Sequence, residues 1–220
     1  MRLVVLRPEP GASATVGRAE AAGLEAFARP MFRVEPLNWT APDLTEFDGV
    51  LVTSANAVRQ AGCQLAALAA LPAYAVGEAT ADAARAAGLT VAATGSAGVA
   101  ALLAELPANL RLLHLSGLER TEAEPRQQVT VVPVYRSVPV EPAPDLAALA
   151  PAVLLVHSPA AGRHLGEVLK ERSRFHVVAI SPAAAAACGS GWASISAAPE
   201  PTDAALLSLA ARLCQQSPPK

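Results

Sequence analysis

The sequence predicts an α/β protein made of two similar lobes, each with a parallel sheet flanked by helices. Three observations support this prediction. Segments of the chain recur 103 or 104 positions apart, and strand-like and helix-like segments alternate through both halves. The strand-like segments are continuous apolar runs, which are typical of parallel sheets that are covered on both faces.

The repeat is clearest in two pairs of segments. Pro30–Pro36 returns as Pro133–Pro139, and Ser54 returns as Ser158, each serine following an apolar run. A chain of 220 residues is long enough for two domains of about 100 residues each. Two similar lobes with two similar connectors form a cleft, and we therefore expect a ligand to bind there.

The first elements follow from apolar runs and a glycine. Residues 3–6 and 26–32 predict strands, and residues 14–22 predict the helix between them. Gly23 ends that helix, because glycine adopts the left-handed C′ conformation without steric cost.

The next strand, over 48–53, is followed by a helix for which Ser54 or Asn56 is the expected N-cap. The same reasoning predicts the rest of the first half: a strand over 73–76, a helix over 78–87 ended by Gly88, a strand at Val91 and a helix over 97–106.

The second half repeats the pattern. A strand over 111–115 is expected to end in a turn at Ser116 and Gly117, and the strand over 129–135 leads into the second connector. The later strands are predicted over 153–157, 177–180 and 194–197, with helices over 146–149, 160–169, 183–188 and 204–214.

Two divisions of the chain fit the repeat. The lobes are either consecutive, divided near residue 108, or the chain leaves the first lobe at one Pro-bounded connector and returns at the other. We favour the second division, because it places the two similar connectors side by side and their prolines stiffen them. It gives a discontinuous domain of residues 1–34 and 140–220, a second domain of residues 37–134, and hinge segments at 33–38 and 134–140.

Composition narrows the class of protein. The net charge of −2 and pI near 6.1 provide no general field for nucleic acid, so an anionic ligand must be held by local groups. We expect Cys63, Cys188 and Cys214 to be free buried thiols in a cytoplasmic protein, and no export signal is evident. The uncharged stretch 175–199 is interrupted by proline and glycine, so we expect a buried strand, turn and helix rather than a membrane span.

Several well-known site motifs are absent from the sequence. It contains no G-x-G-x-x-G, P-loop or G-x-S-x-G pattern, which argues against dinucleotide, nucleotide-hydrolase and α/β-hydrolase sites. His114, His157, His164 and His176 show neither metal-site spacing nor an evident carboxylate partner, and we expect no metal or cofactor.

The main candidate site lies at four strand-to-helix junctions. In a parallel sheet such junctions meet at the carboxyl edge, where free helix N–H groups bind anions and small side chains let a ligand approach. The alternative is ordinary helix capping, although the recurrence of these junctions in both halves favours a ligand. The candidate residues are Ser54, Asn56, Gly77, Thr80, Ser158 and Ser181.

Other candidates are basic or aromatic. Arg7 ends the first strand and is a candidate for anion binding, whereas Arg33 and Arg136 in the connectors either reach a ligand or form surface ion pairs. Tyr135 stands where its repeat mate is Phe32, so the fold does not require its hydroxyl. That hydroxyl either donates a proton in catalysis or faces water.

The ordered set of segments resembles the uroporphyrinogen-III synthase family. No single segment is specific, but together they extend over nearly the whole chain. The matching segments are Arg7–Pro8, Pro30–Pro36, Asp48–Ala57, Tyr74–Ala81, Val134–Tyr135, His157–Ala160 and Ala179–Pro182.

This resemblance implies two α/β lobes joined by a two-stranded linker, with the first lobe discontinuous. It implies a monomeric enzyme without metal or organic cofactor, acting early in haem, sirohaem and cobalamin synthesis. The substrate would be hydroxymethylbilane, a linear tetrapyrrole with eight carboxylates. The enzyme would remove its terminal hydroxyl as water, invert the last pyrrole ring and close the macrocycle.

Some residues of this chain match the family's cleft residues and others depart from them. Ala183 and Ala184 stand where some relatives carry hydroxyl groups, so backbone N–H contacts rather than hydroxyl chemistry are expected at that junction. Ser181 replaces a frequent glycine, which slightly narrows access to the backbone. The matching cleft residues are Ser54, Thr80, Tyr135 and Ser158.

A second class of function fits a doubled α/β unit. Ligand-sensing modules and solute receptors also bind small anions between two lobes without catalysis. A receptor needs an export signal and a regulator needs a DNA-binding module, and neither is evident in the sequence. A flavodoxin-like carrier would need a phosphate loop, which is not recognisable either.

Overall fold

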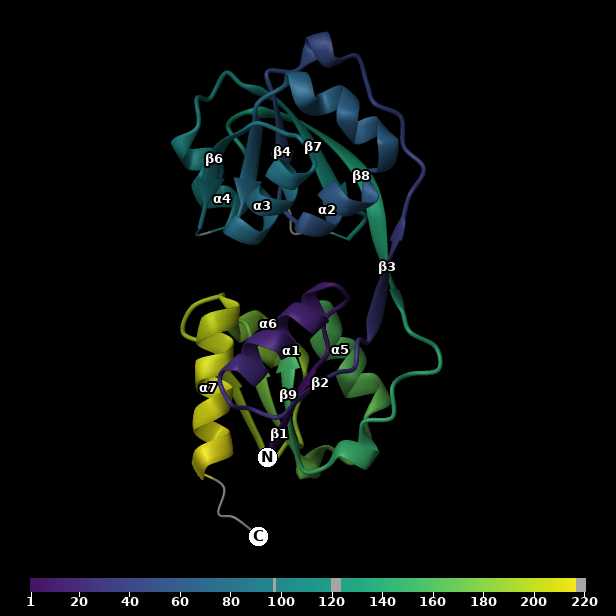
Figure 1. The fold of residues 1–220 in the computed structure, drawn as a ribbon, viewed down its shortest axis with the longest axis vertical. Helices are drawn as coiled ribbons and strands as arrows, with labels where there is room; N and C mark the ends of the chain where they lie inside the picture. The colour runs from purple at the N-terminus through teal and green to yellow at the C-terminus, as the bar shows by residue number, and fades with distance from the viewer. Residues whose placement is uncertain (97, 120–123, 217–220) are drawn as a thin grey trace. The chain divides into compact units, whose positions relative to one another are not determined.

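The computed structural model describes residues 1–96, 98–119 and 124–216. The chain divides into two compact units (Figure 1). The first contains residues 1–33 and 138–220, and the second contains residues 34–137. Each unit is a mainly parallel sheet flanked by helices, so the predicted α/β class is confirmed.

The first unit is built on a five-stranded sheet in the order β11-β10-β9-β1-β2, with every neighbouring pair parallel. Its strands are β1 (Arg2–Val5), β2 (Ala26–Ala28), β9 (Ala152–Val156), β10 (Phe175–Ala179) and β11 (Ser194–Ala197). Its helices are α1 (Gly11–Ala21), α5 (Pro159–Val168), α6 (Pro182–Ala187) and α7 (Asp203–Gln216), with 3-10 turns η3 (Ala147–Leu149) and η4 (Arg172–Arg174).

Alternate strand residues of this sheet enter two separate cores. Val4 and Leu154 pack with residues of α5 and α6, whereas Leu3, Val5 and Leu155 pack with residues of α1 and α7. Both faces of the sheet are therefore covered by helices, which explains why the central strand β9 is apolar at every position.

The second unit is built on a six-stranded sheet in the order β3-β8-β7-β4-β5-β6. Its strands are β3 (Phe32–Pro36), β4 (Gly49–Val52), β5 (Ala73–Val76), β6 (Val91–Gly95), β7 (Arg111–Gly117) and β8 (Gln128–Pro139). Its helices are α2 (Ala55–Gln60), α3 (Glu78–Ala86) and α4 (Val99–Glu105), with 3-10 segments η1 (Leu44–Glu46) and η2 (Gly62–Ala70).

The sequence repeat is also a repeat of strand pairing. Gly49 pairs with Leu112, and the residue 104 positions after Gly49, Val153, pairs with Leu3. Val50 pairs with Ala73 in the same way that Leu154 pairs with Val177. The central strands of the two sheets therefore have the same order and the same register.

Strands β3 and β8 carry the chain between the two units. They are neighbours in the sheet and run in opposite directions, since the chain enters the second unit through β3 and leaves it through β8. Backbone N–H groups of Leu37 and Val140 donate to the carbonyls of Val134 and Met31. Arg136 Nη2 lies 2.9 Å from Glu35 Oε2 across the two strands, so Arg136 forms the surface ion pair that was one of its two predicted roles.

Several local predictions are wrong. Ser116 and Gly117 do not form a turn, because both continue β7 and pair with β8. Residues 26–32 form two strands rather than one, since β2 ends at Ala28 and β3 begins at Phe32. Of the three thiols expected to be buried, only Cys188 is buried: Cys63, on η2, is exposed and Cys214, on α7, is half-buried. No helix among the described residues is long and apolar enough to cross a bilayer.

Candidate functional site

The carboxyl edge of the second unit's sheet gathers most of the predicted site residues. Ser54 follows β4 and Gly77 follows β5, and these parallel strands are neighbours. The Ser54 hydroxyl accepts a hydrogen bond from the Asn56 backbone N–H at 3.2 Å, so Ser54 is the N-cap of α2. Asn56 lies in the first turn and is half-buried.

Helix α3 begins differently from α2. Its N-cap is Gly77, at φ 82°, and no side chain caps its first turn. Glycine suits this left-handed conformation, and the absence of a Cβ leaves the backbone open to approach. Thr80, the third residue of the helix, is only 5% exposed, so the backbone at Gly77 is more open to a ligand than the Thr80 side chain.

Tyr135 lies on β8 at the level where β7 ends. It pairs with Gly117, the last residue of β7, and its carbonyl accepts a hydrogen bond from the Leu118 N–H at 2.8 Å. The Tyr135 side chain is partly buried against the core that also contains Val52 of β4. The structure thus places Tyr135 at the same sheet edge as Ser54.

The carboxyl edge of the first unit's sheet carries the remaining predicted residues. Ser158 follows β9 and Ser181 follows β10, and both are in extended conformation as N-caps. Their hydroxyls accept hydrogen bonds from the backbone N–H groups of Ala161 at 3.1 Å and Ala184 at 3.2 Å. Proline follows each serine and fixes the first helical residue.

Asp203 organises a polar cluster at this edge. The carboxylate of Asp203, the first residue of α7, accepts hydrogen bonds from Thr15 Oγ1 at 3.0 Å and Arg18 Nε at 2.8 Å. His157 Nε2 lies 2.9 Å from Asp203 Oδ1, and Arg7 Nη1 lies 3.7 Å from the same atom. The predicted anion-binding Arg7 therefore belongs to a cluster that contains two arginines and one carboxylate.

The cluster has defined protonation states at neutral pH. Burial acts to raise the pKa of Asp203, but hydrogen bonds from His157 and Arg18 outweigh it and hold that pKa well below its usual range. Burial lowers the pKa of His157 and outweighs the hydrogen bond to Asp203. Because the Asp203 carboxylate only accepts, the neutral His157 donates its Nε2–H to it.

The residue before each repeated serine is anchored through a hydrogen bond that involves histidine. In the first unit this residue is His157, bound to Asp203, and in the second it is Thr53, whose Oγ1 lies 3.0 Å from His114 Nε2. The predicted lack of carboxylate partners is wrong for His157, and also for His164, whose Nδ1 lies 3.6 Å from Glu167 Oε2. Asp203 is 46 residues away in the chain, and only the folding of α7 brings it to the end of β9.

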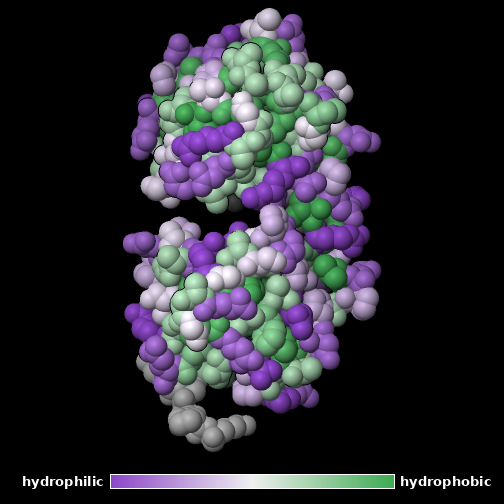
Figure 2. All heavy atoms as spheres, viewed as in Figure 1, coloured by the Kyte–Doolittle hydropathy of each residue, from purple (hydrophilic) through white to green (hydrophobic). Residues whose placement is uncertain are grey.

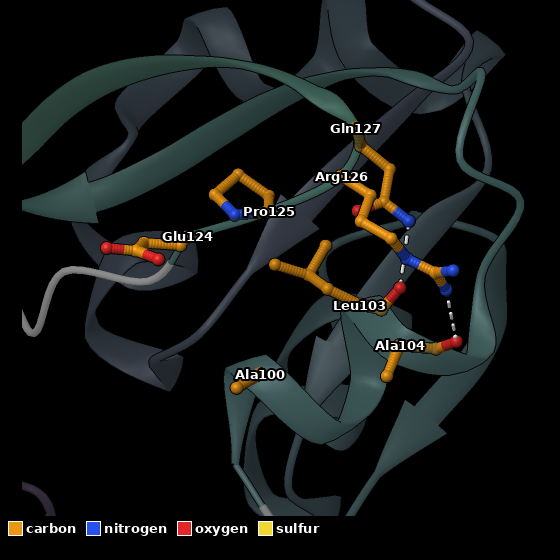
Figure 3. Close-up of a pocket in the computed structure, with 7 residues that line it drawn as sticks. All are labelled: Ala100, Leu103, Ala104, Glu124, Pro125, Arg126 and Gln127. Carbon is orange, nitrogen blue, oxygen red and sulfur yellow. Dashed lines mark hydrogen bonds between the residues drawn. The ribbon is translucent and has the colours of Figure 1, made fainter.

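Two small cavities lie away from these junctions. One, of about 90 Å³, is bordered by α4 and residues 124–127 (Figure 3). There the Gln127 side chain donates hydrogen bonds to the carbonyls of Leu103 and Leu106, so its amide caps the C-terminal end of α4. The other, of about 300 Å³, is bordered by residues 143–147 and 168–171. Neither contains a predicted site residue.

Polar and apolar residues are interspersed on the face of each unit drawn in Figure 2. Within the described ranges, no group of three or more His, Cys, Asp or Glu side chains lies close enough together to hold a metal ion.

Comparisons with known proteins agree on one family. The sequence matches the family model of uroporphyrinogen-III synthase HemD over residues 13–208. The fold is similar to that of uroporphyrinogen-III synthetase from Helicobacter pylori, with a TM-score of 0.63 and 20% identity over 97% of this chain and 100% of that one. A mutant uroporphyrinogen III synthase from Thermus thermophilus gives a TM-score of 0.53 and 18% identity over 99% and 100%. No curated protein sequence matches the chain.

Proposed function

The chain belongs to the uroporphyrinogen-III synthase family, and from this premise we propose that it closes hydroxymethylbilane to uroporphyrinogen III. The family match over residues 13–208 is the observation that carries the proposal, and it makes the protein an enzyme of haem biosynthesis. The reaction class is that of a lyase, since the terminal hydroxyl leaves as water and ring D is inverted as the macrocycle closes.

The chemistry demands orientation more than acid strength. The pyrrole nitrogen assists the loss of hydroxide from the bilane, and the resulting cation closes without inversion when no enzyme is present. The protein must therefore hold the chain so that the carbon which leads to inversion lies nearest to the cation. Positioning of this kind accounts for large rate effects without a strong acid or a metal.

The carboxyl edges of the two sheets supply groups that suit a substrate with eight carboxylates. Each edge presents helix N-termini, whose N–H groups and dipoles favour anions. The uncapped start of α3 at Gly77 supports carboxylate binding in the second unit. In the first unit, the N-termini that begin after Ser158 and Ser181 and the guanidinium of Arg7 have the same role.

Tyr135 is the proposed proton donor. Its ring is partly buried at the carboxyl edge of the second unit's sheet, beside the end of β7. A phenol hydroxyl donates a hydrogen bond and can protonate a departing hydroxide as charge develops on it. Tyr135 therefore assists departure of the terminal hydroxyl, and the backbone N–H groups anchor the rest of the substrate.

We further propose a cytoplasmic enzyme that acts as a monomer. The three cysteines are free thiols, which suits a reducing compartment. The proposal of a monomer rests on the resemblance to the family, and sedimentation across a range of protein concentrations tests it. A mass that increases with concentration contradicts it.

The product isomer tests the proposed function. Freshly prepared hydroxymethylbilane is mixed with the protein or with buffer, and the oxidised products are separated into type III and type I isomers. We expect mostly type III with protein and type I with buffer. Type I alone in both samples contradicts the proposal, and substrate binding without conversion favours the non-catalytic module instead.

A further inference from the structure

The pairing of β7 with β8 changes register where β7 ends. Ser116 pairs with Pro133, but the next residue of β7, Gly117, pairs with Tyr135. Val134 is therefore the extra residue of a β-bulge. A bulge of this kind redirects the side chains that follow it and is frequent beside active sites. Pro133 suits the irregular position, since it has no N–H to donate to a ladder.

The bulge places two consecutive side chains on the same face of the sheet. In a regular strand Val134 and Tyr135 would point to opposite faces. Here Val134 is fully buried in the core formed with Leu113 and Leu115, and the Tyr135 ring packs against that same core. Gly117 continues the alternation of Leu113 and Leu115, so the ring lies on the face to which a side chain at position 117 would point.

The Tyr135 ring occupies the space that a side chain at 117 would need. A Cβ atom built on Gly117 would stand 2.8 Å from Tyr135 Cζ and 3.0 Å from its hydroxyl oxygen. Non-bonded carbon atoms keep a separation of roughly 3.5–4.0 Å, so ring and methyl group cannot occupy these positions together. Gly117 is not among the glycines with positive φ, so its backbone is open to other residues and the ring is the obstacle.

We propose that Gly117 is a positioning residue for the reaction. Because Gly117 has no side chain, the Tyr135 ring and its hydroxyl can occupy the space beside it, which we call the seat of Tyr135. The inference depends on the proposed function, in which that hydroxyl donates the proton. The Ser54 junction lies on the other side of the seat, because β4, which leads into Ser54, is the neighbour of β7 opposite β8.

The contact predicts that Gly117→Ala lowers turnover more than it disturbs the fold. The atoms that a methyl group at 117 meets are the far end of the Tyr135 side chain, which can swing away while the backbone stays in place. Gly117→Ala should therefore displace the hydroxyl without unfolding the sheet. Loss of a positioned proton donor lowers turnover by up to roughly 10²-fold, whereas substrate binding by backbone groups is unaffected.

The experiment compares Gly117→Ala, Tyr135→Phe and the double variant with the parent protein. We expect Gly117→Ala to lower kcat by roughly 10–100-fold with KM changed less than about threefold, and the double variant to match Tyr135→Phe alone. Gly17→Ala is the matched control, because this exposed helical glycine has open space around it, and its kcat and KM should equal those of the parent.

The outcomes separate this inference from the proposed function. If Tyr135→Phe lowers kcat but Gly117→Ala does not, the seat is wrong and the proton donor stands. If the two effects multiply in the double variant, Gly117 acts independently of the hydroxyl and the inference is also wrong. If neither substitution changes kcat, both the seat and the proton donor are wrong, while type III product would still support the overall function.

A spectroscopic measurement checks the contact itself. The chain has two tyrosines, so ring-labelled tyrosine gives two sets of NMR signals that Tyr135→Phe assigns. Gly117→Ala should shift the Tyr135 ring signals and leave those of Tyr74 in place, and unshifted Tyr135 signals would overturn the proposal. If Gly117→Ala alone does not fold, adding Tyr135→Ala should restore folding by removing the ring, and failure to restore it counts against the seat.

Discussion

His157 Nε2 lies 2.9 Å from Asp203 Oδ1 and joins the end of β9 to the first residue of α7. Both side chains are largely shielded, with 9% and 17% exposed. The bond anchors the backbone immediately before Ser158, the N-cap of α5. A pair of residues that need not contact the substrate thus supports the proposed substrate-binding edge of the first unit.

Replacing Asp203 with asparagine should destabilise the protein. The substitution leaves Arg18 without its charged partner and weakens the bonds from Thr15 and His157, a loss of roughly 2–4 kcal/mol in the free energy of unfolding at pH 7. Urea unfolding measures it.

The same measurement at lower pH checks the charge of Asp203. Because folding lowers its pKa, the unfolded chain binds the proton more tightly, and the carboxylate's contribution is present above about pH 4 and lost as the pH falls further. The difference in free energy of unfolding between the parent and Asp203→Asn should therefore decrease as the pH falls from about 5 to about 3. A gap that stays constant contradicts the assigned ionisation.

His157 should make the protein sensitive to mild acid. Burial lowers its pKa in the folded state, so the unfolded chain takes up the proton first, and stability falls as the pH drops below about 6.5. His157→Gln removes the titration while keeping a side-chain N–H. Its free energy of unfolding should vary less between pH 7.5 and pH 5 than that of the parent, on the order of 1 kcal/mol less. Parallel pH profiles would show that His157 does not titrate in this range.

Two substitutions of Ser158 separate capping from binding. Ser158→Ala should cost about 1 kcal/mol of stability, whereas Ser158→Gly should cost only a few tenths, since glycine is a good N-cap. If the backbone N–H groups bind the substrate, KM should rise less than about threefold in Ser158→Gly, because those groups remain. A rise of about tenfold or more in both variants would assign binding to the hydroxyl.

Tyr135→Phe should lower kcat by one to two orders of magnitude, roughly the effect of losing a positioned proton donor. Tyr74→Phe is the control, because Tyr74 packs against the core on the other face of the sheet. Steady-state rates of type III formation measure both variants. Unchanged kcat in Tyr135→Phe would make the hydroxyl incidental to the reaction.

The sequence alone was sufficient for the fold class and for the order of most elements. The serine junctions could be found because capping is a local event, and Ser54, Ser158 and Ser181 each accept from a backbone N–H two or three residues ahead. The recurrence of strands at an interval of 104 residues could be found because each half must bury the same kind of sheet.

Contacts between distant segments were beyond the sequence. Nothing near His157 indicates Asp203, and nothing near Gly117 indicates that a strand continues and meets Tyr135. Gly117 was expected in a turn, since glycine after serine favours turns locally, but pairing with β8 overrides that preference. Its role depends on a bulge in the partner strand, which has no local signal.

The most direct measurement is the response of backbone amides to the product. At 22.4 kDa the protein is accessible to amide NMR, and uroporphyrinogen III carries the carboxylates of the substrate. On titration without oxygen, we expect the largest shifts in the first turns of α2, α3, α5 and α6, at the carboxyl edges of both sheets. Shifts confined to the amino ends of the strands, with those four helix starts unchanged, would contradict the account.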